Sequence, residues 1–301
     1  MQQRSNGLAA LRAIGTSILT LGALTACGGG GSSNNSSGGT PTATVSAIVV
    51  NATKYAASAT VTINGTGLDS TLAVTSAVCT GMTLQSGSTS TSATYTCTVS
   101  GGLTGTVVAK SNGTQVGSAT LTVPAPIVRM AINNGLSAVG NIDVTLAPDK
   151  APITVNNFLA YVNSGFYNNT IFHRIVPNFV AQGGGYAAPV TNLSTATLKT
   201  GLLASIGYEN SGLSHTAGTI AMAANSLGQE NSQFFFDLIT NTNLDGAYTV
   251  FGSISAGSSV LTAITAAPAS CTTTTVDTAG DTETDCLPTP NVVVTSATQI
   301  Q

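Results

Sequence analysis

The chain has 301 residues, of which 6% are charged, and its formal net charge is −3. Proteins that bind nucleic acid through its phosphates need clustered Lys and Arg side chains, so this composition excludes nucleic acid as a partner. The length suffices for two domains that each bury a core. Tryptophan is absent and Gly, Ser, Thr, Ala and Val are abundant, which favours β-strands joined by many turns.

The N-terminus has the pattern of an export signal. Arg4 and Arg12 give it a basic start, and an apolar run follows over residues 13–26. This run is too short to span a bilayer comfortably as a helix, so residues 1–26 are predicted to be a signal peptide. No later stretch is apolar for long enough to cross a membrane.

The apolar run ends in a Leu-Thr-Ala-Cys sequence at residues 24–27, which resembles the lipobox of bacterial lipoproteins. In that family the peptide is cut before the cysteine, whose thiol then carries a diacylglycerol. The resemblance implies that Cys27 is lipidated and that this lipid is the chain's only membrane attachment. Because Gly28 follows, we expect the bacterial outer membrane, facing the periplasm. The alternative is an ordinary cleaved signal with an incidental cysteine.

A linker and a first β domain are predicted next. Residues 27–41 are rich in Gly, Ser and Asn and indicate a flexible linker. Residues 42–124 alternate Val, Ile, Thr and Leu between turn residues, which predicts a small antiparallel β-sandwich. The candidate strands are residues 43–50, 59–65, 71–84, 92–101, 105–113 and 118–124. The region resembles the immunoglobulin-like modules of exported bacterial proteins, and we interpret it as a spacer.

Four cysteines remain once Cys27 is set aside. In an oxidising compartment the simplest of the three connectivities pairs Cys79 with Cys97 and Cys271 with Cys286. A zinc site would need Cys or His side chains at short spacings, and the sequence has none. We therefore expect two disulfides and no metal.

Residues 126–301 predict a second domain. Its elements are a hairpin (127–133 and 138–147), an amphipathic helix (151–164), further strands, a second helix (257–267) and a last strand (291–299). Pro152 suits the first turn of the first helix, where its missing N–H is not needed. Apolar residues recur at spacings of three and four along that helix.

The densest cluster of chemically useful residues is the segment 172–185, FHRIVPNFVAQGGG, in which two strands meet at Pro177-Asn178. Strict alternation places Phe172, Arg174 and Val176 on one face, and Ile171, His173 and Ile175 on the other. An arginine among apolar side chains is costly to bury unless it is paired, but it is tolerated at the border of a cleft. Arg174 is therefore the candidate functional residue.

This segment is similar to the signature of the cyclophilin family, and the similarity extends over nearly all of residues 126–301. It is carried by residues 140–185, 218–223, 232–235, 244–246 and 250–252, in the order and spacing of the family. Several blocks in order are more specific than one short motif. The resemblance implies an eight-stranded antiparallel β-barrel capped by two helices, Xaa-Pro peptide bonds as substrate, and no cofactor.

The resemblance also implies roles for individual residues. Arg174 matches the family's catalytic arginine. The positions that match the family's proline pocket are Phe179, Val180, Phe235, Leu244 and Tyr248. Gln182 and the backbone of Ala224 match the positions that hold the peptide, and Ala223 and Gln233 belong to the same substrate-binding set. The expected partners are proline-containing unfolded or exported polypeptides, and we expect a monomer.

Physical chemistry supports a role for the arginine. Rotation about a peptide bond is opposed by a barrier of about 18–20 kcal/mol, because the nitrogen lone pair is delocalised. In the twisted state the prolyl nitrogen becomes pyramidal and accepts a hydrogen bond. A guanidinium is protonated at any physiological pH and can donate that bond. No nucleophile or general base is required.

Four positions depart from the usual family pattern. Asn243 stands where many members have tryptophan, Tyr248 where many have histidine, Val180 where a longer methionine is common, and Ala224 where asparagine is usual. The tryptophan that Asn243 replaces is prominent in cyclosporin binding in the family. We therefore expect isomerase turnover to be kept and cyclosporin to bind poorly.

A hydrolase, a calcium-binding protein and a peptide-binding module are the alternative functions. A Ser/His/Asp hydrolase would have to use His173 or His215, but the chain has no G-x-S-x-G elbow, and His173 is better explained as a core residue. The acidic residues of 277–285 lack the order of an EF-hand, so a solvated hairpin is favoured over a calcium site. The remaining rival is a peptide-binding or chaperone module of the same fold with little isomerase activity.

Overall fold

The computed structural model describes residues 43–136, 138–225, 227–267, 269–276 and 282–301. The chain divides into Met1–Thr40 and Pro41–Gln301, and all described residues fall in the second unit. The predicted signal peptide, lipidated Cys27 and linker therefore lie outside the described residues. None of the helices described is long and apolar enough to span a bilayer.

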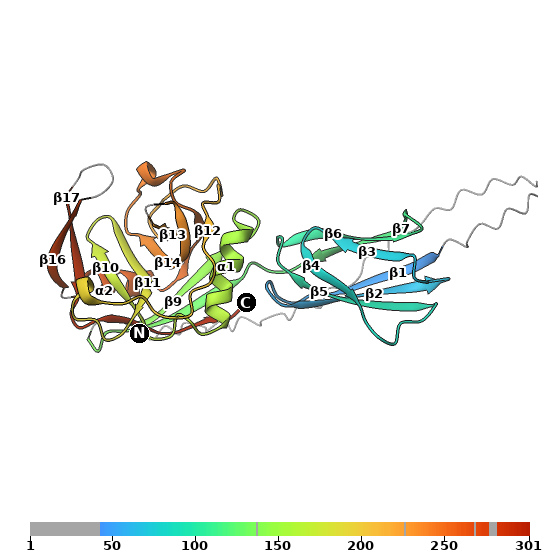
Figure 1. Ribbon diagram of the computed structural model, residues 1–301, viewed down its shortest axis with the longest axis horizontal. Helices are drawn as coiled ribbons and strands as arrows, with labels where there is room; N and C mark the ends of the chain where they lie inside the picture. Colours follow the sequence, from blue (N-terminus) through green and yellow to red (C-terminus); the bar gives the residue numbers. More distant parts are fainter. Residues whose placement is uncertain (1–42, 137, 226, 268, 277–281) are drawn as a thin grey trace, which may run out of the picture. The chain divides into compact units, whose positions relative to one another are not determined.

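Seven strands in residues 44–122 form two antiparallel sheets (Figure 1). They are β1 (Thr44–Asn51), β2 (Ser58–Thr66), β3 (Leu72–Ser76), β4 (Cys79–Leu84), β5 (Ser92–Val99), β6 (Thr104–Ser111) and β7 (Thr114–Thr122). One sheet has the order β1-β2-β5-β4 and the other β3-β6-β7. The period-two pattern behind the sequence prediction is visible in β2, where Ala59, Val61 and Ile63 are buried and their neighbours are less so.

One predicted strand in this region is wrong. The apolar run 71–84 was expected to form a single strand, but the chain turns at Ala77-Val78, so that β3 pairs with β6 and β4 pairs with β5. Val78 is itself buried at this corner. Ala77 is exposed but also apolar, so neither residue gives a sign of a turn in the sequence.

The disulfide between Cys79 and Cys97 is confirmed. It joins the neighbouring strands β4 and β5, with 5.7 Å between the two Cα atoms. The strands β16 (Ala269–Val276) and β17 (Thr282–Pro288) place Cys271 opposite Cys286 in register. The side chains of this second pair lie outside the described residues, as do those of the acidic segment 277–285, so that disulfide remains a prediction.

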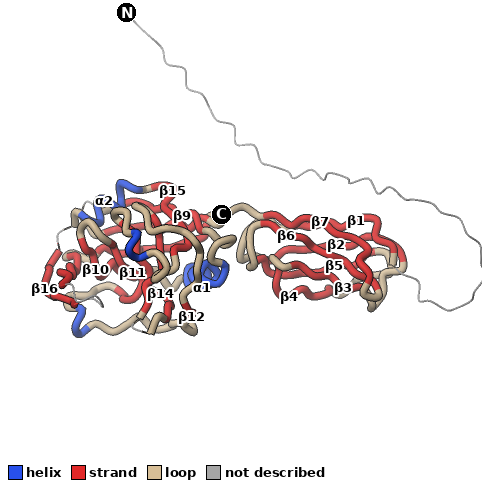
Figure 2. The backbone as a smooth tube through the Cα atoms, turned by 90° about the horizontal axis from the view of Figure 1, so that it is seen from above, coloured by secondary structure: helices blue, strands red, loops and turns tan. Residues whose placement is uncertain are grey.

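Eight strands of residues 127–299 close into an antiparallel barrel, as the sequence predicted. They are β8 (Ile127–Asn133), β9 (Val139–Leu146), β10 (Thr170–Val176), β11 (Val180–Ala187), β13 (Thr219–Ala224), β14 (Gln229–Asp237), β15 (Val250–Ala256) and β18 (Val292–Gln299). The order around the barrel is β11-β14-β13-β15-β9-β8-β18-β10, and β10 pairs back with β11. The short strand β12 (Ile206–Gly207) adds to β14, and the β16–β17 hairpin continues from β10 (Figure 2).

Two helices accompany the barrel at the places predicted. Helix α1 (Pro152–Asn163) buries Val155, Phe158, Leu159 and Val162, and α2 (Ser258–Thr265) buries Leu261 and Ile264. Proline occupies the start of α1 as expected. The side chain of Glu209 accepts hydrogen bonds from the Ile153 and Thr154 amides, at 3.2 and 2.9 Å, and so satisfies free N–H groups of the first turn.

The barrel interior is filled by aromatic rings. Phe158, Tyr167, Phe172, Phe234 and Phe236 are fully buried and contact one another. A separate apolar cluster is formed by Val180, Ala221, Phe235 and Val250, and none of these five rings belongs to it. Phe234 and Phe236 therefore point into the barrel, whereas Phe235 between them points to the opposite side of the wall. The candidate site lies against this second cluster.

Candidate active site

A cavity of about 110 Å³ lies against the second cluster. Its lining residues are Arg174, Phe179, Val180, Gln182, Ala223, Ala224, Phe235, Leu244 and Tyr248. The structure thus brings nine of the ten predicted catalytic and substrate-binding residues together around one cavity. The tenth, Gln233, touches the set, because Gln182 Nε2 donates to Gln233 Oε1 at 2.9 Å.

Four neighbouring strands position these side chains. Across the sheet, Arg174 on β10 pairs with Gln182 on β11, Gln182 pairs with Phe235 on β14, and Phe235 pairs with Ala221 on β13. Directly paired residues project to the same face of a sheet. The arginine, the glutamine and the phenylalanine therefore form one row along the outside of the barrel wall.

The predicted faces of β10 are partly wrong. Phe172 pairs with Gly183, but Arg174 pairs with Gln182, so two steps on β10 match one step on β11. This bulge breaks strict alternation. As a result Phe172 and Ile175 both belong to the interior core, whereas Arg174 lines the cavity outside it. If residues 172–174 paired regularly, without the bulge, Arg174 would share the interior face with Phe172, as strict alternation had indicated.

The turn between β10 and β11 places Phe179 at the cavity. Asn178 has a φ of 59°, a left-handed conformation that asparagine tolerates better than most residues. The Phe179 amide donates to the Val176 carbonyl at 3.1 Å, and the Leu238 amide donates to the Phe179 carbonyl at 2.9 Å. The backbone of Phe179 is therefore fixed on both sides.

The cavity combines an apolar base with polar edges. Phe235 and Tyr248 meet edge to face, with ring centroids 5.6 Å apart. Phe179 and Leu244 pack against the same cluster. The guanidinium of Arg174 and the amide of Gln182 supply hydrogen-bond donors at the edge. Such a site can hold a small apolar ring while a cation donates to an atom beside it.

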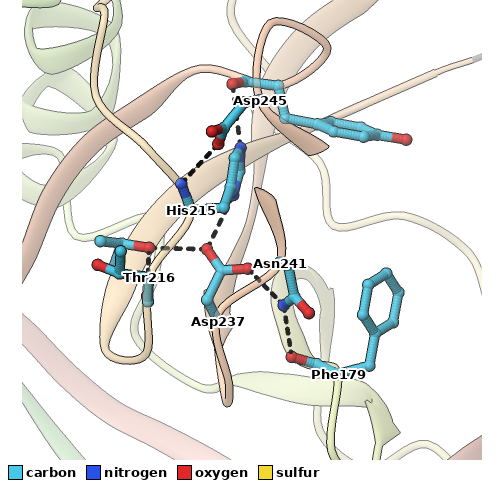
Figure 3. A network of polar contacts seen from close by, with 8 residues as sticks. Phe179, His215, Thr216, Asp237, Asn241 and Asp245 are labelled. Carbon is cyan, nitrogen blue, oxygen red and sulfur yellow. Dashed lines mark hydrogen bonds and ion pairs between the residues drawn. The ribbon is translucent and has the colours of Figure 1, made fainter. Parts of the chain in front are cut away.

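A network of polar contacts, drawn in Figure 3, was not predicted from the sequence. It adjoins the cavity because His215 contacts the lining residues Phe235 and Tyr248. His215 Nδ1 lies 2.9 Å from Asp237 Oδ2, and both side chains are fully buried. Asp237 also accepts hydrogen bonds from Thr219 and Asn241, at 2.7 and 2.8 Å. The only sequence signal was the presence of each residue, because His215 and Thr219 are 22 and 18 positions from Asp237 and only Asn241 is close to it in the chain.

This network is not a hydrolase site. A catalytic histidine must have its second ring nitrogen within hydrogen-bond reach of a nucleophile. Nε2 of His215 instead faces the backbone carbonyl of Tyr248 at 3.3 Å. The other histidine, His173, is buried and packs edge-on against Tyr186, with ring centroids 4.8 Å apart. The interpretation of His173 as a core residue is confirmed.

A buried carboxyl group lies on strand β14. Glu230 is fully buried, and its Oε1 accepts from the Thr249 hydroxyl at 2.8 Å. Burial raises the pKa of Glu230 to about 7. Its position in register opposite Ala224 connects it to the backbone that borders the cavity.

Other possible sites offer fewer charged or metal-binding groups. A second cavity, of about 220 Å³, is lined by Pro177, Asn178, Leu238, Ile239, Leu261, Thr262 and Thr265. None of these residues is charged, so this cavity has no group to polarise an amide. Within the described residues, no three His, Cys, Asp or Glu side chains gather as metal ligands.

Comparison with known proteins agrees with this geometry. Residues 127–299 match a family model described as cyclophilin type peptidyl-prolyl cis-trans isomerase. The chain belongs to the cyclophilin family. It is an enzyme of the peptidyl-prolyl cis-trans isomerase class, and the match covers the barrel, both helices and all residues of the cavity.

Three bacterial relatives are 40–42% identical to the chain and are named peptidyl-prolyl cis-trans isomerases. The protein from Acinetobacter baylyi is 42% identical over 44% of this chain and 70% of its own length. The isomerase A of Dickeya dadantii is 40% identical over 41% and 65%, and the isomerase B of Escherichia coli is 40% identical over 35% and 62%. The chain thus spans about two thirds of these relatives.

A solved cyclophilin-type isomerase from Cryptosporidium parvum also matches. It is 22% identical, with a TM-score of 0.44, over 59% of this chain and 99% of its own. A second structure of that protein was determined in the presence of the dipeptide Ala-Pro.

Proposed function

We propose that this cyclophilin isomerises Xaa-Pro bonds of exported polypeptides while tethered to the bacterial envelope through a lipid on Cys27. The observation that supports the catalytic part is the position of Arg174, which lines the same small cavity as Phe179, Phe235 and Tyr248. Family membership gives the reaction class, and the lining of this cavity supports Arg174 and its neighbours as the residues that perform it.

The residues of the cavity have different roles in this reaction. The proline ring binds among Phe179, Phe235, Leu244 and Tyr248, which fixes one side of the peptide bond. Gln182 holds the peptide on the other side, and the Arg174 guanidinium donates to the prolyl nitrogen. That nitrogen becomes a good acceptor only when the bond is twisted, so the hydrogen bond favours the transition state over both planar isomers.

The polypeptide substrates follow from the predicted address of the chain. The pattern of residues 1–27 supports export and lipidation. The two sheets of residues 44–122, which we regard as an immunoglobulin-like spacer, follow the predicted linker. A lipid-anchored monomer of this kind meets unfolded polypeptides as they enter the periplasm, and it needs no cofactor.

The test compares the two arginines of residues 126–301 in the full chain. Arg174→Ala is expected to lower kcat/KM for a proline tetrapeptide by at least about 100-fold, the order seen when a preorganised donor is removed. Arg129→Ala is the matched control. Arg129 forms an exposed two-point ion pair with Asp143, at 2.8 and 2.7 Å, and is not part of the cavity.

The control is expected to keep the wild-type kcat/KM. If wild type and Arg174→Ala accelerate isomerisation equally little, while both bind the peptide, the chain is a peptide-binding or chaperone module and the proposal fails.

A further inference from the structure

The polar network of Figure 3 lies directly behind the walls of the cavity. His215 and Asp237 are completely buried and do not line the cavity themselves. His215 is held from several sides: its amide donates to Asp245 Oδ1 at 2.8 Å, and its carbonyl accepts from the Asn241 amide at 2.9 Å. The histidine is therefore fixed in backbone and side chain.

The ring of His215 contacts two walls of the cavity. It stacks on Phe235 with ring centroids 5.7 Å apart and an interplanar angle of 9°. It meets Tyr248 edge to face at 6.5 Å, and its Nε2 lies 3.3 Å from the Tyr248 carbonyl. Both ring nitrogens thus face oxygen atoms, Asp237 on one side and Tyr248 on the other, which fixes the plane of the ring.

Asp237 extends this connection to the third aromatic wall. Its Oδ1 accepts a hydrogen bond from Asn241 Nδ2 at 2.8 Å. The same Asn241 amide donates to the Phe179 carbonyl at 3.1 Å. A buried carboxylate that is fully hydrogen-bonded is rigid, because any displacement would leave a buried polar group unsatisfied. The spacing of Phe179, Phe235 and Tyr248 therefore depends on one buried pair.

We propose that His215 and Asp237 are positioning residues that set the size and shape of the proline pocket and, through it, the selectivity for a five-membered ring. This inference rests on the proposed isomerase function. The cavity is small, and a misplacement of about 1 Å in a catalytic site can cost on the order of 100-fold in rate. Neither residue touches the substrate, so each acts only through the three aromatic walls.

The decisive experiment uses the full chain with His215→Phe, which keeps a stacking ring but removes both polar contacts. The matched control is Tyr167→Phe, which removes another buried hydrogen bond of an aromatic ring, from the Tyr167 hydroxyl to the Ser232 carbonyl at 2.8 Å, away from the cavity. Each variant is assayed with two peptides, one containing proline and one containing its six-membered homologue, pipecolic acid.

For His215→Phe we expect kcat/KM with the proline peptide to fall about tenfold, and the preference for proline over pipecolic acid to fall at least about threefold. Tyr167→Phe is expected to lose thermal stability but to keep both quantities within about twofold. An unchanged preference in His215→Phe would overturn the proposal. An equal loss in both variants would also overturn it, because the effect would then be one of stability alone.

If His215→Phe does not fold, Asn241→Ala takes its place, since it disconnects Asp237 from Phe179 and leaves the His215 ring intact. The same loss of preference supports the proposal, and wild-type preference overturns it. Failure of the isomerase function itself is recognised separately, as wild type that binds the proline peptide without turnover. In that case the dissociation constants of the two peptides replace kcat/KM, with the same outcomes for each variant.

Discussion

Burial strongly changes the pKa of the Glu230 side chain. Burial raises its pKa from 4.5 to about 7, and its Oε2 has no hydrogen-bond partner among the described residues. The Thr249 hydroxyl bonds Oε1, and the same Thr249 oxygen accepts the Glu209 amide at 2.9 Å. This carboxyl group is therefore held in its protonated form well above the pH at which an exposed glutamate ionises.

A raised acid pKa has a definite consequence for stability. The unfolded chain releases this proton near pH 4.5 and the folded chain near pH 7, so the contribution of Glu230 is complete below pH 4.5 and is lost as the pH rises to about 7. We expect the Tm of wild type to fall between pH 5 and pH 8 relative to Glu230→Gln, by on the order of 3 °C. Thermal unfolding of both proteins across this range measures the difference, and parallel curves would contradict it.

At the same scale, the sequence predicted the residues of the cavity but not those behind it. Arg174, Phe179 and Gln182 stand in a continuous signature, so a family pattern identifies them. His215 and Asp237 are separated by 22 residues and meet only because β14 folds back beside the segment that precedes β13. No local pattern records such a contact.

At the scale of elements, predictions succeeded where one periodicity holds from end to end. Helix α1 has apolar residues at regular helical spacing and was placed within one residue at each end. The run 71–84 and strand β10 failed for a shared reason: each contains a local irregularity, at Ala77-Val78 and between Phe172 and Arg174, inside a sequence that reads as one continuous strand. The order of apolar and polar residues does not record where a strand turns or gains an extra residue.

The disulfide between β4 and β5 is expected to stabilise its own sheet without affecting catalysis. The two cysteines are 18 residues apart, a loop for which cross-linking contributes about 3 kcal/mol. Calorimetry of Cys79→Ser/Cys97→Ser should show a lower Tm for this region, while kcat/KM keeps its wild-type value because neither cysteine belongs to the cavity. A wild-type Tm would show that the bond adds no stability.

The same calorimetric measurement on Cys271→Ser/Cys286→Ser serves as a comparison. The register of β16 and β17 places these two cysteines opposite each other, which is compatible with a second disulfide.

At the scale of the whole molecule, the proposed lipid separates location from activity. Cys27→Ser removes the only thiol that the lipobox pattern offers for modification. We expect the variant to move from the membrane fraction to the soluble fraction of the envelope and to lose labelling by a radioactive fatty acid. Its isomerase activity per molecule should not change, since the cavity lies within residues 174–248. Retention in the membrane fraction would refute lipidation at this cysteine.

The extra residue in β10 also constrains how this enzyme can change. Because of the bulge, Phe172 and Arg174 face opposite sides of the barrel wall. Substitutions of interior side chains therefore leave the direction of the guanidinium unchanged. Regular pairing is different. If residues 172–174 of β10 all paired in step with β11, the hydrophobic content of the strand would stay intact and yet the positive charge would face the interior rings. Loss of the extra residue would instead leave Phe172 and Arg174 adjacent and still on opposite faces, so in this wall a change of pairing register is more damaging than a one-residue deletion or an exchange of side chains.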